Sequence, residues 1–253
     1  MSEDRHIQGL LLTTTLILIR HGETAWNREK RLQGQIDTPL SEVGQQQARA
    51  VAMRFGAALG LQADAEGQVP SIVDVVLSSD LSRAMQTAAP LAEALGLSVM
   101  PEPGLRERHY GVFQGTTRDQ IAVQWPDDHA RWIGHDPDFA PEGGESMRQL
   151  SERVVRTLGR VAKTYPGKTV VCVTHGGVLD CAYRFAAPLP LEAPRQHTLL
   201  NASVNTIQWY SNANANANAN GHGADANANA NGTAHLIAWG DVAHLSATKD
   251  DSI

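Results

Sequence analysis

The sequence is poor in cysteine, in positive charge and in long apolar runs, and each shortage excludes a class of protein. Its two cysteines, Cys172 and Cys181, are too few and wrongly spaced for a disulfide framework or a CxxC metal site, which favours a reducing, cytoplasmic setting. Lys and Arg number 21 against 27 Asp and Glu, a net charge of −6, so we expect neither nucleic acid nor a membrane as partner. An anionic ligand would need a locally positive site within this acidic chain.

A threonine-rich apolar run over Leu10–Ile19 imitates the core of a signal peptide. It leads straight into Arg20 without a small-residue cleavage site, and it is far shorter than the ~20 apolar residues of a membrane span. We therefore expect this run to form a buried first strand.

The 253 residues, 42% of them apolar, are enough for a full-sized core. Three short, β-branched segments, Leu16–Ile19, Ile72–Leu77 and Thr169–Val173, have the composition of central parallel strands, and each precedes a helical pattern. This alternation predicts an α/β fold with three αβα layers around a mostly parallel, doubly wound sheet. In such sheets, ligands bind beyond the carboxyl ends of the strands.

The helical patterns carry start and stop signals. Ser41 is expected to cap the first helix, whose buried face holds Ala48, Val51, Ala52 and Phe55. Asp80 is expected to cap the second, which Pro90 should kink or interrupt and Gly96 should end. Ser146 and Gln149 form a capping-box pattern at the start of the third, which Pro166-Gly167 stops.

Asn-Ala repeats over 212–220 and 227–231 cannot bury enough apolar surface to offset their ordering entropy. We expect residues 211–233 to form a flexible loop without assigned function, joining two hairpin strands over Ser203–Tyr210 and Ala234–Trp239. The whole chain, 1–253, is then one domain, with residues 111–145 as a variable segment that forms a lid.

Cationic and imidazole side chains follow the three predicted strands. Arg20 and His21 end the first, Arg83 lies in the first helical turn after the second, and His175 ends the third before Gly176-Gly177. Guanidinium groups and helix-start amides match phosphate oxygens. Each residue alone has an ordinary alternative as an ion-pair partner or a core histidine, but four at three neighbouring strand ends favour a phosphate site.

The motifs around these residues resemble, in order, those of the histidine phosphatase superfamily, in the branch that contains the phosphoglycerate mutases. The matching segments, within Thr15–Trp209, are Arg20-His21-Gly22-Glu23-Thr24-Ala25-Trp26-Asn27, Arg31 to Ser41, Ser78 to Ala88, Leu105-Arg106-Glu107 with Gly111 and Gly115, and Thr174-His175-Gly176-Gly177. A single tripeptide is weak evidence, whereas the ordered series is specific.

The resemblance implies a metal-independent, cofactor-free phosphoryl transfer through a phosphohistidine on a small phosphorylated metabolite. His21 is then the nucleophile and Glu107 the general acid and base, at the rim of the pocket. The implied phosphate-binding residues are Arg20, Asn27, Gln33, Gly34, Arg83, His175 and Gly176. Apart from the motif, the alternative for Glu107 is a surface ion pair with Arg106 or Arg108.

The alternatives are a phosphatase, a mutase and a catalytically silent binder, together with a metal-dependent hydrolase that uses His21 and His175 and would lose its activity in EDTA. Mutases of the family carry paired arginines in the insertion, but Thr116–Glu145 holds only the separated Arg118 and Arg131, which favours a phosphatase. A silent binder would lack His21, His175 or Glu107, and all three are present. The substrate and the oligomeric state stay open.

The remaining candidate residues are assigned structural roles. Trp125, Trp132 and Phe139 are expected either to line the pocket or to pack within the lid, and Cys172 is expected to be an inert core thiol. The other histidines show no metal-ligand spacing and are His109, His129, His135, His197, His222, His235 and His244.

Overall fold

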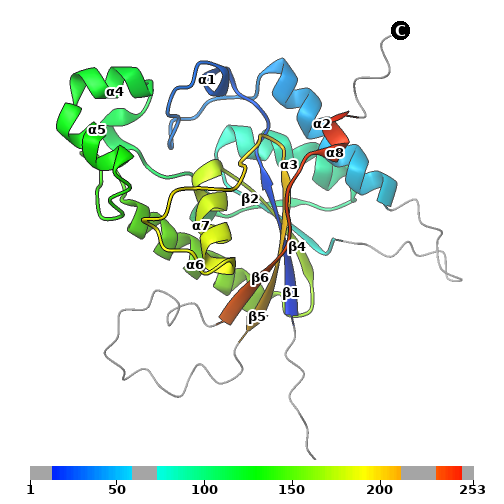
Figure 1. The fold of residues 1–253 in the computed structure, drawn as a ribbon. Helices are drawn as coiled ribbons and strands as arrows, with labels where there is room; N and C mark the ends of the chain where they lie inside the picture. The colour runs from blue at the N-terminus through cyan, green and yellow to red at the C-terminus, as the bar shows by residue number, and fades with distance from the viewer. Residues whose placement is uncertain (1–12, 59–72, 212–231, 247–253) are drawn as a thin grey trace, which may run out of the picture.

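The computed structural model describes residues 13–58, 73–211 and 232–246, which form a six-stranded sheet between two helical layers (Figure 1). The sheet order is β3-β2-β4-β1-β5-β6. The first four strands in this order are parallel, β5 runs antiparallel to β1, and β6 runs antiparallel to β5. The strands are β1 (Thr13–Arg20), β2 (Val75–Ser78), β3 (Val99–Pro101), β4 (Thr169–Thr174), β5 (Val204–Ser211) and β6 (Gly232–Asp241). The predicted three-layer, mostly parallel fold is confirmed.

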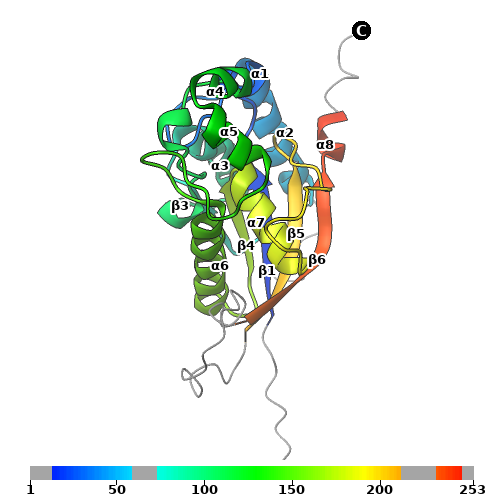
Figure 2. The same cartoon turned by 60° about the vertical axis from the view of Figure 1, so that its left-hand side comes forward.

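The two helical layers bury opposite faces of the sheet (Figure 2). One core lies under α6 (Met147–Thr164) and α7 (Gly176–Ala186), and the other under α2 (Glu42–Ala58) and α3 (Ser82–Ala94). The remaining helices are α1 (Ala25–Arg28), α4 (Arg118–Gln124), α5 (Pro126–Ile133) and α8 (Ala243–Ser246), with 3₁₀ turns at Pro103–Leu105 and Gly111–Phe113.

The central strand β1 shows why both faces need helices. Leu16 and Leu18 belong to the core under α6 and α7, whereas Ile17 and Ile19 pack into the core under α2 and α3. Side chains alternate between faces along a strand, so an apolar run needs cover on both sides. The expected buried first strand is therefore observed, beginning at Thr13 within the described residues.

Two of the three predicted helix starts are correct and one is wrong. Ser41 Oγ accepts the N–H of Gly44, and Ser146 forms the predicted capping box with Gln149. Asp80 does not cap α3, because Arg106 binds its carboxylate at 2.5–2.7 Å. Asp37, remote in sequence, instead accepts the N–H of Ser82 at 2.7 Å. Long-range pairing has overridden the local capping pattern.

Helix α3 is not interrupted at Pro90, where a kink or an interruption was expected, and it ends before Gly96, which has a φ of +65°. Pro90 removes the N–H that would bond the carbonyl of Gln86. Gln86 is an exposed residue, so water reaches this turn and the missing bond costs little.

Residues 111–145 form a cap over the carboxyl ends of the parallel strands, built from α4, α5 and connecting turns (Figure 1). The cap has its own core of Phe113, Ile121 and Phe139, against which Trp125 and Trp132 pack.

The hairpin of β5 and β6 is observed as predicted, whereas residues 212–231, with the Asn-Ala repeats, lie outside the described residues. Among the described helices, none is long and apolar enough to cross a membrane.

Candidate active site

A pocket of about 610 Å³ opens between the carboxyl ends of β1 and β4 and the cap. Its walls contain most of the residues that the motifs single out, namely Arg20, His21, Asn27, Gln33, Gly34, Arg83, Glu107 and Gly176. His175 lies directly behind them, with its ring centroid 5.1 Å from that of His21. The fold therefore brings all the predicted site residues together, although they come from positions 20 to 176 of the chain.

The first turn after β1 fixes the tautomer of His21. The imidazole is 2% exposed, and its Nδ1 lies 2.7 Å from the carbonyl oxygen of Gly22. Because a carbonyl only accepts hydrogen bonds, Nδ1 must carry the proton, which leaves a lone pair on Nε2. The turn also passes close to α2: a Cβ on Gly22 would lie 2.5 Å from the carbonyl oxygen of Gly44, so this approach requires glycine.

Both histidines are neutral in the free pocket. Burial, followed by the charges of Arg83 and Arg20, holds the pKa of His21 well below its usual range. Burial and the Arg83 charge do the same to the pKa of His175, whose Nε2 lies 2.8 Å from Ser79 Oγ. His21 is thus a free-base nucleophile at neutral pH, and arginines alone supply the positive charge.

Arg20 and Arg83 are anchored by carbonyl oxygens rather than by carboxylates. Arg83 is 1% exposed and donates to Ile36 and Gly34 at 3.0 and 2.7 Å, while Arg20 donates to Leu199. Burial lowers the pKa of Arg83 to about 10, which leaves it charged at neutral pH. Among the described residues, the Nε atoms of both arginines are buried without a hydrogen-bond partner. Such unpaired donors indicate an anion-binding site.

Glu107 follows the 3₁₀ turn at Pro103–Leu105, and backbone amides hold its carboxylate against the start of α7. Each of its oxygens is 3.1 Å from the N–H of Gly177, and Oε1 also accepts the N–H of Arg108 at 2.7 Å. The alternative of an ion pair with its neighbours is not observed, because Arg106 binds Asp80 and Arg108 donates to two carbonyls. Glu107 therefore keeps a carboxylate edge available to a ligand in the pocket.

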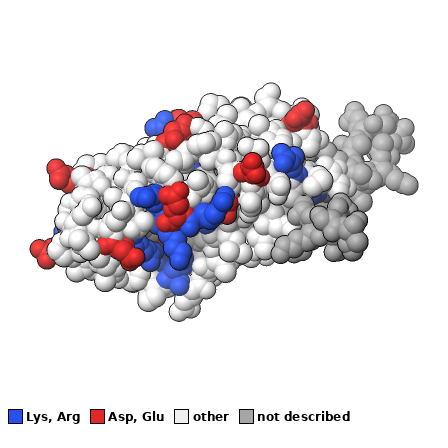
Figure 3. All heavy atoms as spheres, turned by 90° about the horizontal axis from the view of Figure 1, so that it is seen from above, with Lys and Arg blue, Asp and Glu red and all other residues white. Residues whose placement is uncertain are grey.

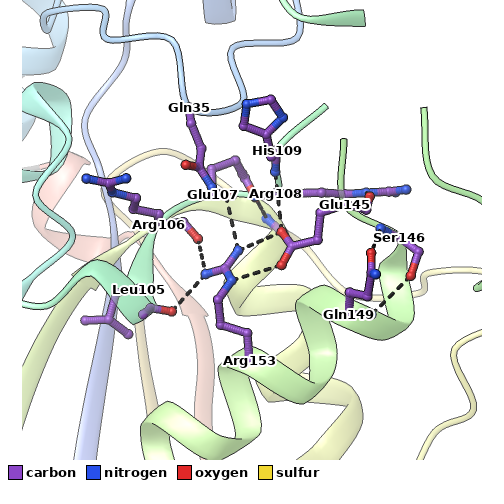
Figure 4. Close-up of polar contacts among 12 residues, drawn as sticks. Gln35, Leu105, Arg106, Glu107, Arg108, His109, Glu145, Ser146, Gln149 and Arg153 are labelled. Carbon is purple, nitrogen blue, oxygen red and sulfur yellow. Dashed lines mark hydrogen bonds and ion pairs between the residues drawn. The ribbon is translucent and has the colours of Figure 1, made fainter. Parts of the chain in front are cut away.

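The backbone that carries Glu107 is fixed from helix α6 (Figure 4). Arg153 binds Glu145 at 2.8 Å and donates to the carbonyls of Gly104, Arg106 and Glu107 at 2.9, 2.8 and 3.3 Å. Gln35 adds a bond to the Glu107 carbonyl at 3.1 Å. These bonds hold the carboxylate at the edge of the pocket in one place.

Several residues that shape the pocket escaped the sequence reasoning. Asn201 donates to the carbonyl of His21 at 3.0 Å, and Arg195 and Tyr110 line the walls. Gly177 was noticed only as a helix-opening glycine, although its amide holds Glu107. Asn201 and Arg195 come from the α7–β5 connection, where no pattern of burial or charge marks them in the sequence.

The other aromatic, histidine and cysteine residues lie partly at the pocket and partly in the cores. Trp132 and His135 line the pocket, whereas Trp125 and Phe139 pack within the cap. His197 pairs with Asp180 at 2.9 Å. Burial raises the pKa of the Cys172 thiol to about 12, as expected for an inert core cysteine. Among the described residues, no group of three or more His, Cys, Asp or Glu side chains is arranged to hold a metal ion.

Comparisons with known proteins agree with this geometry. The chain is 38% identical over 97% of its length to a metal-independent phosphoserine phosphatase of Arabidopsis thaliana, covering 88% of that protein. It is 32% identical over 92% of its length to phosphoglycerate mutase-like protein 4 of the same plant, covering 87% of it.

Among solved structures, a mycobacterial glucosyl-3-phosphoglycerate phosphatase matches 79% of this chain and 92% of its own, with a TM-score of 0.66 and 32% identity. The model of the histidine phosphatase superfamily (branch 1) matches residues 16–220. The chain therefore belongs to the histidine phosphatase superfamily.

Proposed function

We propose that this phosphatase hydrolyses small phosphomonoesters through a phosphohistidine formed at His21, and that its preferred substrates carry a second anionic group. The observation that carries the first part is the neutral, tautomer-fixed imidazole of His21 in a pocket lined by Arg20 and Arg83, whose Nε donors are buried and unpaired among the described residues. Water-exposed imidazoles are neither held in one tautomer nor surrounded by such donors.

In the first step, His21 Nε2 attacks phosphorus, and the bond from phosphorus to the ester oxygen breaks. Arg20, Arg83 and His175 hold the equatorial oxygens, assisted by Asn27, Gln33 and the amides of Gly34 and Gly176. Positioning and a fixed positive field are what a phosphoryl transition state needs most.

Glu107 transfers its proton to the departing alkoxide. In the second step it removes a proton from the water that attacks the phosphohistidine, which releases inorganic phosphate and restores His21. The placement of the carboxylate at the rim, held by two amide groups, supports this role.

The cap supports hydrolysis over mutase chemistry. Arg131 is bound to Asp136 at 2.7 Å and lies over the ring of Phe139, so it does not pair with Arg118 at the pocket. The cap therefore offers no arginine pair of the kind expected in a mutase.

The second anionic group is inferred from where unpaired arginines lie. Among the described residues, the arginines without a carboxylate within ion-pair distance are Arg20, Arg49, Arg83, Arg108, Arg118, Arg156 and Arg195. All except Arg49 and Arg156 line the pocket. Figure 3 looks down on this end of the molecule, where the largest group of Lys and Arg lies near the middle of the face, with Asp and Glu beside it.

Of the five that line the pocket, Arg118 and Arg195 are exposed, one on the cap and the other on the α7–β5 connection. Both guanidinium groups are reached by solvent, unlike that of Arg83, and a carboxylate or second phosphate on the substrate would pair with them. The named substrates of two relatives, phosphoserine and glucosyl-3-phosphoglycerate, are phosphomonoesters with a carboxylate, which agrees with this inference.

The test measures phosphate release in the presence of EDTA from three substrates. Phosphoserine and 3-phosphoglycerate carry a carboxylate besides the phosphate, whereas p-nitrophenyl phosphate has no second anionic group. We expect wild type to hydrolyse them and His21→Ala to be inactive. Isomer formation from 3-phosphoglycerate that outpaces phosphate release would instead identify a mutase.

A second arm tests the anionic group. Arg195→Gln and Arg118→Gln should raise KM for the carboxylated substrates roughly five- to tenfold and leave p-nitrophenyl phosphate nearly unchanged. Arg156→Gln, an exposed arginine of α6 remote from the pocket, is the matched control. Equal effects on all three substrates would contradict a second anion site.

A further inference from the structure

The side chain of Gln33 is held by two hydroxyl groups that the catalytic scheme does not use. Gln33 lines the pocket and is 7% exposed. Its Oε1 accepts hydrogen bonds from Thr38 Oγ1 at 2.5 Å and from Thr24 Oγ1 at 3.0 Å. Thr24 is fully buried and Thr38 is 9% exposed. The amide nitrogen of Gln33 has no hydrogen-bond partner among the described residues.

The start of helix α1 determines the direction of the Thr24 hydroxyl proton. Thr24 caps this helix, so its Oγ1 accepts the N–H of Asn27 at 3.2 Å. The hydroxyl must then donate its own proton elsewhere. Asn27 Oδ1 lies 3.1 Å away, but its two lone pairs already accept the N–H of Thr24 at 3.0 Å and the amide of Asn201 at 3.3 Å. Gln33 Oε1 accepts one bond, from Thr38, and its second lone pair is the acceptor left for Thr24.

These hydrogen bonds distinguish the oxygen of the Gln33 side-chain amide from its NH₂ group, which is similar in shape. A hydroxyl that donates requires an oxygen opposite it, so the oxygen of Gln33 faces Thr24 and Thr38, and the NH₂ group faces the pocket. Rotated by half a turn, the amide would present its oxygen to a phosphate oxygen. Two acceptors would then meet without a proton between them in a buried site, which is costly.

We propose that Thr24 and Thr38 are positioning residues that hold Gln33 with its NH₂ group toward the transferred phosphoryl group. The inference rests on the proposed function, in which Gln33 contacts that group. The N-cap of the short helix α1 then contributes to the anion site. The backbone N–H of Asn27 determines the direction of the Thr24 hydroxyl proton, and that proton determines the orientation of the Gln33 amide.

Thr38 is the better position for a test, since loss of Thr24 would also remove the cap of α1. Thr38→Val keeps the shape of the side chain but removes the donor, and Thr38→Ser keeps the donor. The probe is inorganic phosphate as a competitive inhibitor of p-nitrophenyl phosphate hydrolysis. We expect Thr38→Val to weaken inhibition about five- to tenfold, with a matching rise in KM and a smaller change in kcat, and Thr38→Ser to stay within about twofold of wild type.

A double-mutant cycle separates positioning from a general structural effect. In the Gln33→Ala background, Thr38→Val should have no further effect on phosphate inhibition, because Thr38 acts through Gln33. An undiminished effect in that background would overturn the proposal, as would wild-type inhibition in Thr38→Val or in Gln33→Ala. These outcomes leave the proposed function intact, whereas residual turnover by His21→Ala contradicts the function itself.

Discussion

Replacing Gly177 by alanine should displace the carboxylate of Glu107 and impair its function as the acid, although Glu107 itself is not substituted. A Cβ at position 177 would lie 2.3 Å from Glu107 Oε1 and 3.1 Å from a methyl group of Leu150. Ordinary contacts begin near 3.4 Å, so the carboxylate has to move by about 1 Å, because Leu150 is fully buried and cannot move away instead. The same movement breaks the bonds from the Gly177 amide to both carboxylate oxygens.

The size of the effect depends on the leaving group. A displacement of about 1 Å costs on the order of 10²-fold in rate, within the 10²- to 10⁴-fold range of general acid–base catalysis. An alkoxide such as that of serine needs the proton from Glu107, whereas p-nitrophenolate leaves readily without it. We therefore expect kcat/KM to fall about 100-fold for phosphoserine, or roughly 2.7 kcal/mol, and less than tenfold for p-nitrophenyl phosphate.

The assay compares kcat/KM for the two substrates in wild type, Gly177→Ala, Glu107→Gln and the double variant. Gly177→Ala should reproduce the selective loss of Glu107→Gln, and combining them should add little, since both remove one group. Gly56→Ala on α2, which does not line the pocket, is the control: its Cβ would lie 3.8 Å from Ala94 Cβ, an ordinary contact, so kcat/KM for both substrates should stay near wild type. Equal losses for both substrates in Gly177→Ala would refute the assignment of Glu107 as the acid.

Two further predictions concern stability. Because the pKa values of His21 and His175 are depressed in the folded state, the unfolded state binds more protons below pH ~6.5, and the free energy of unfolding should fall there by up to about 1.4 kcal/mol per pH unit for each histidine. Urea unfolding at pH 7.5 and 5.5 measures this loss; it should be smaller in His175→Asn, and an unchanged pH dependence would show that the histidine is not buried in its neutral form. In the cap, Phe113→Ala should lower the free energy of unfolding by about 3–5 kcal/mol, because Phe113 is fully buried among aromatic rings. Val123 on α4 is 82% exposed, so Val123→Ala should change the free energy of unfolding by less than about 0.5 kcal/mol. A loss in Phe113→Ala as small as that in Val123→Ala would mean that the cap core does not contribute to stability.

The sequence predicted those parts of the fold and site that depend on local pattern. Strands such as Thr169–Thr174 carry a continuous β-branched run, and the capping box of Ser146 and Gln149 is a contact within one turn. The cap of α3 was misjudged because it is a long-range contact with Asp37, and no local pattern identifies such a partner. Strand β3 was missed, because its three residues Val99–Pro101 form no recognisable run.

The site divides in the same way. Residues that follow strands, such as His21 and His175, were found because strand ends of a parallel sheet must converge. Whether these histidines are charged could not be read from the sequence, since it depends on burial and on two arginines that come from different strand ends. Asn201 was missed for the reason that Asp37 was: it reaches the His21 carbonyl from 180 residues away.

The neutral histidines have a consequence for selectivity. If both histidines were protonated, four adjacent cations would repel one another in the empty pocket. Such a pocket would bind any anion, including chloride or a carboxylate. With His21 and His175 uncharged, the cations that act on the nucleophile are Arg83 and Arg20, whose two positive charges match the two negative charges of a phosphomonoester. Two arginines anchored on carbonyls cannot move apart to fit a different anion, because Arg83 is bound to two carbonyls and fully enclosed. Charge balance and rigid anchoring therefore both favour a phosphate dianion in a protein whose overall charge would otherwise repel it.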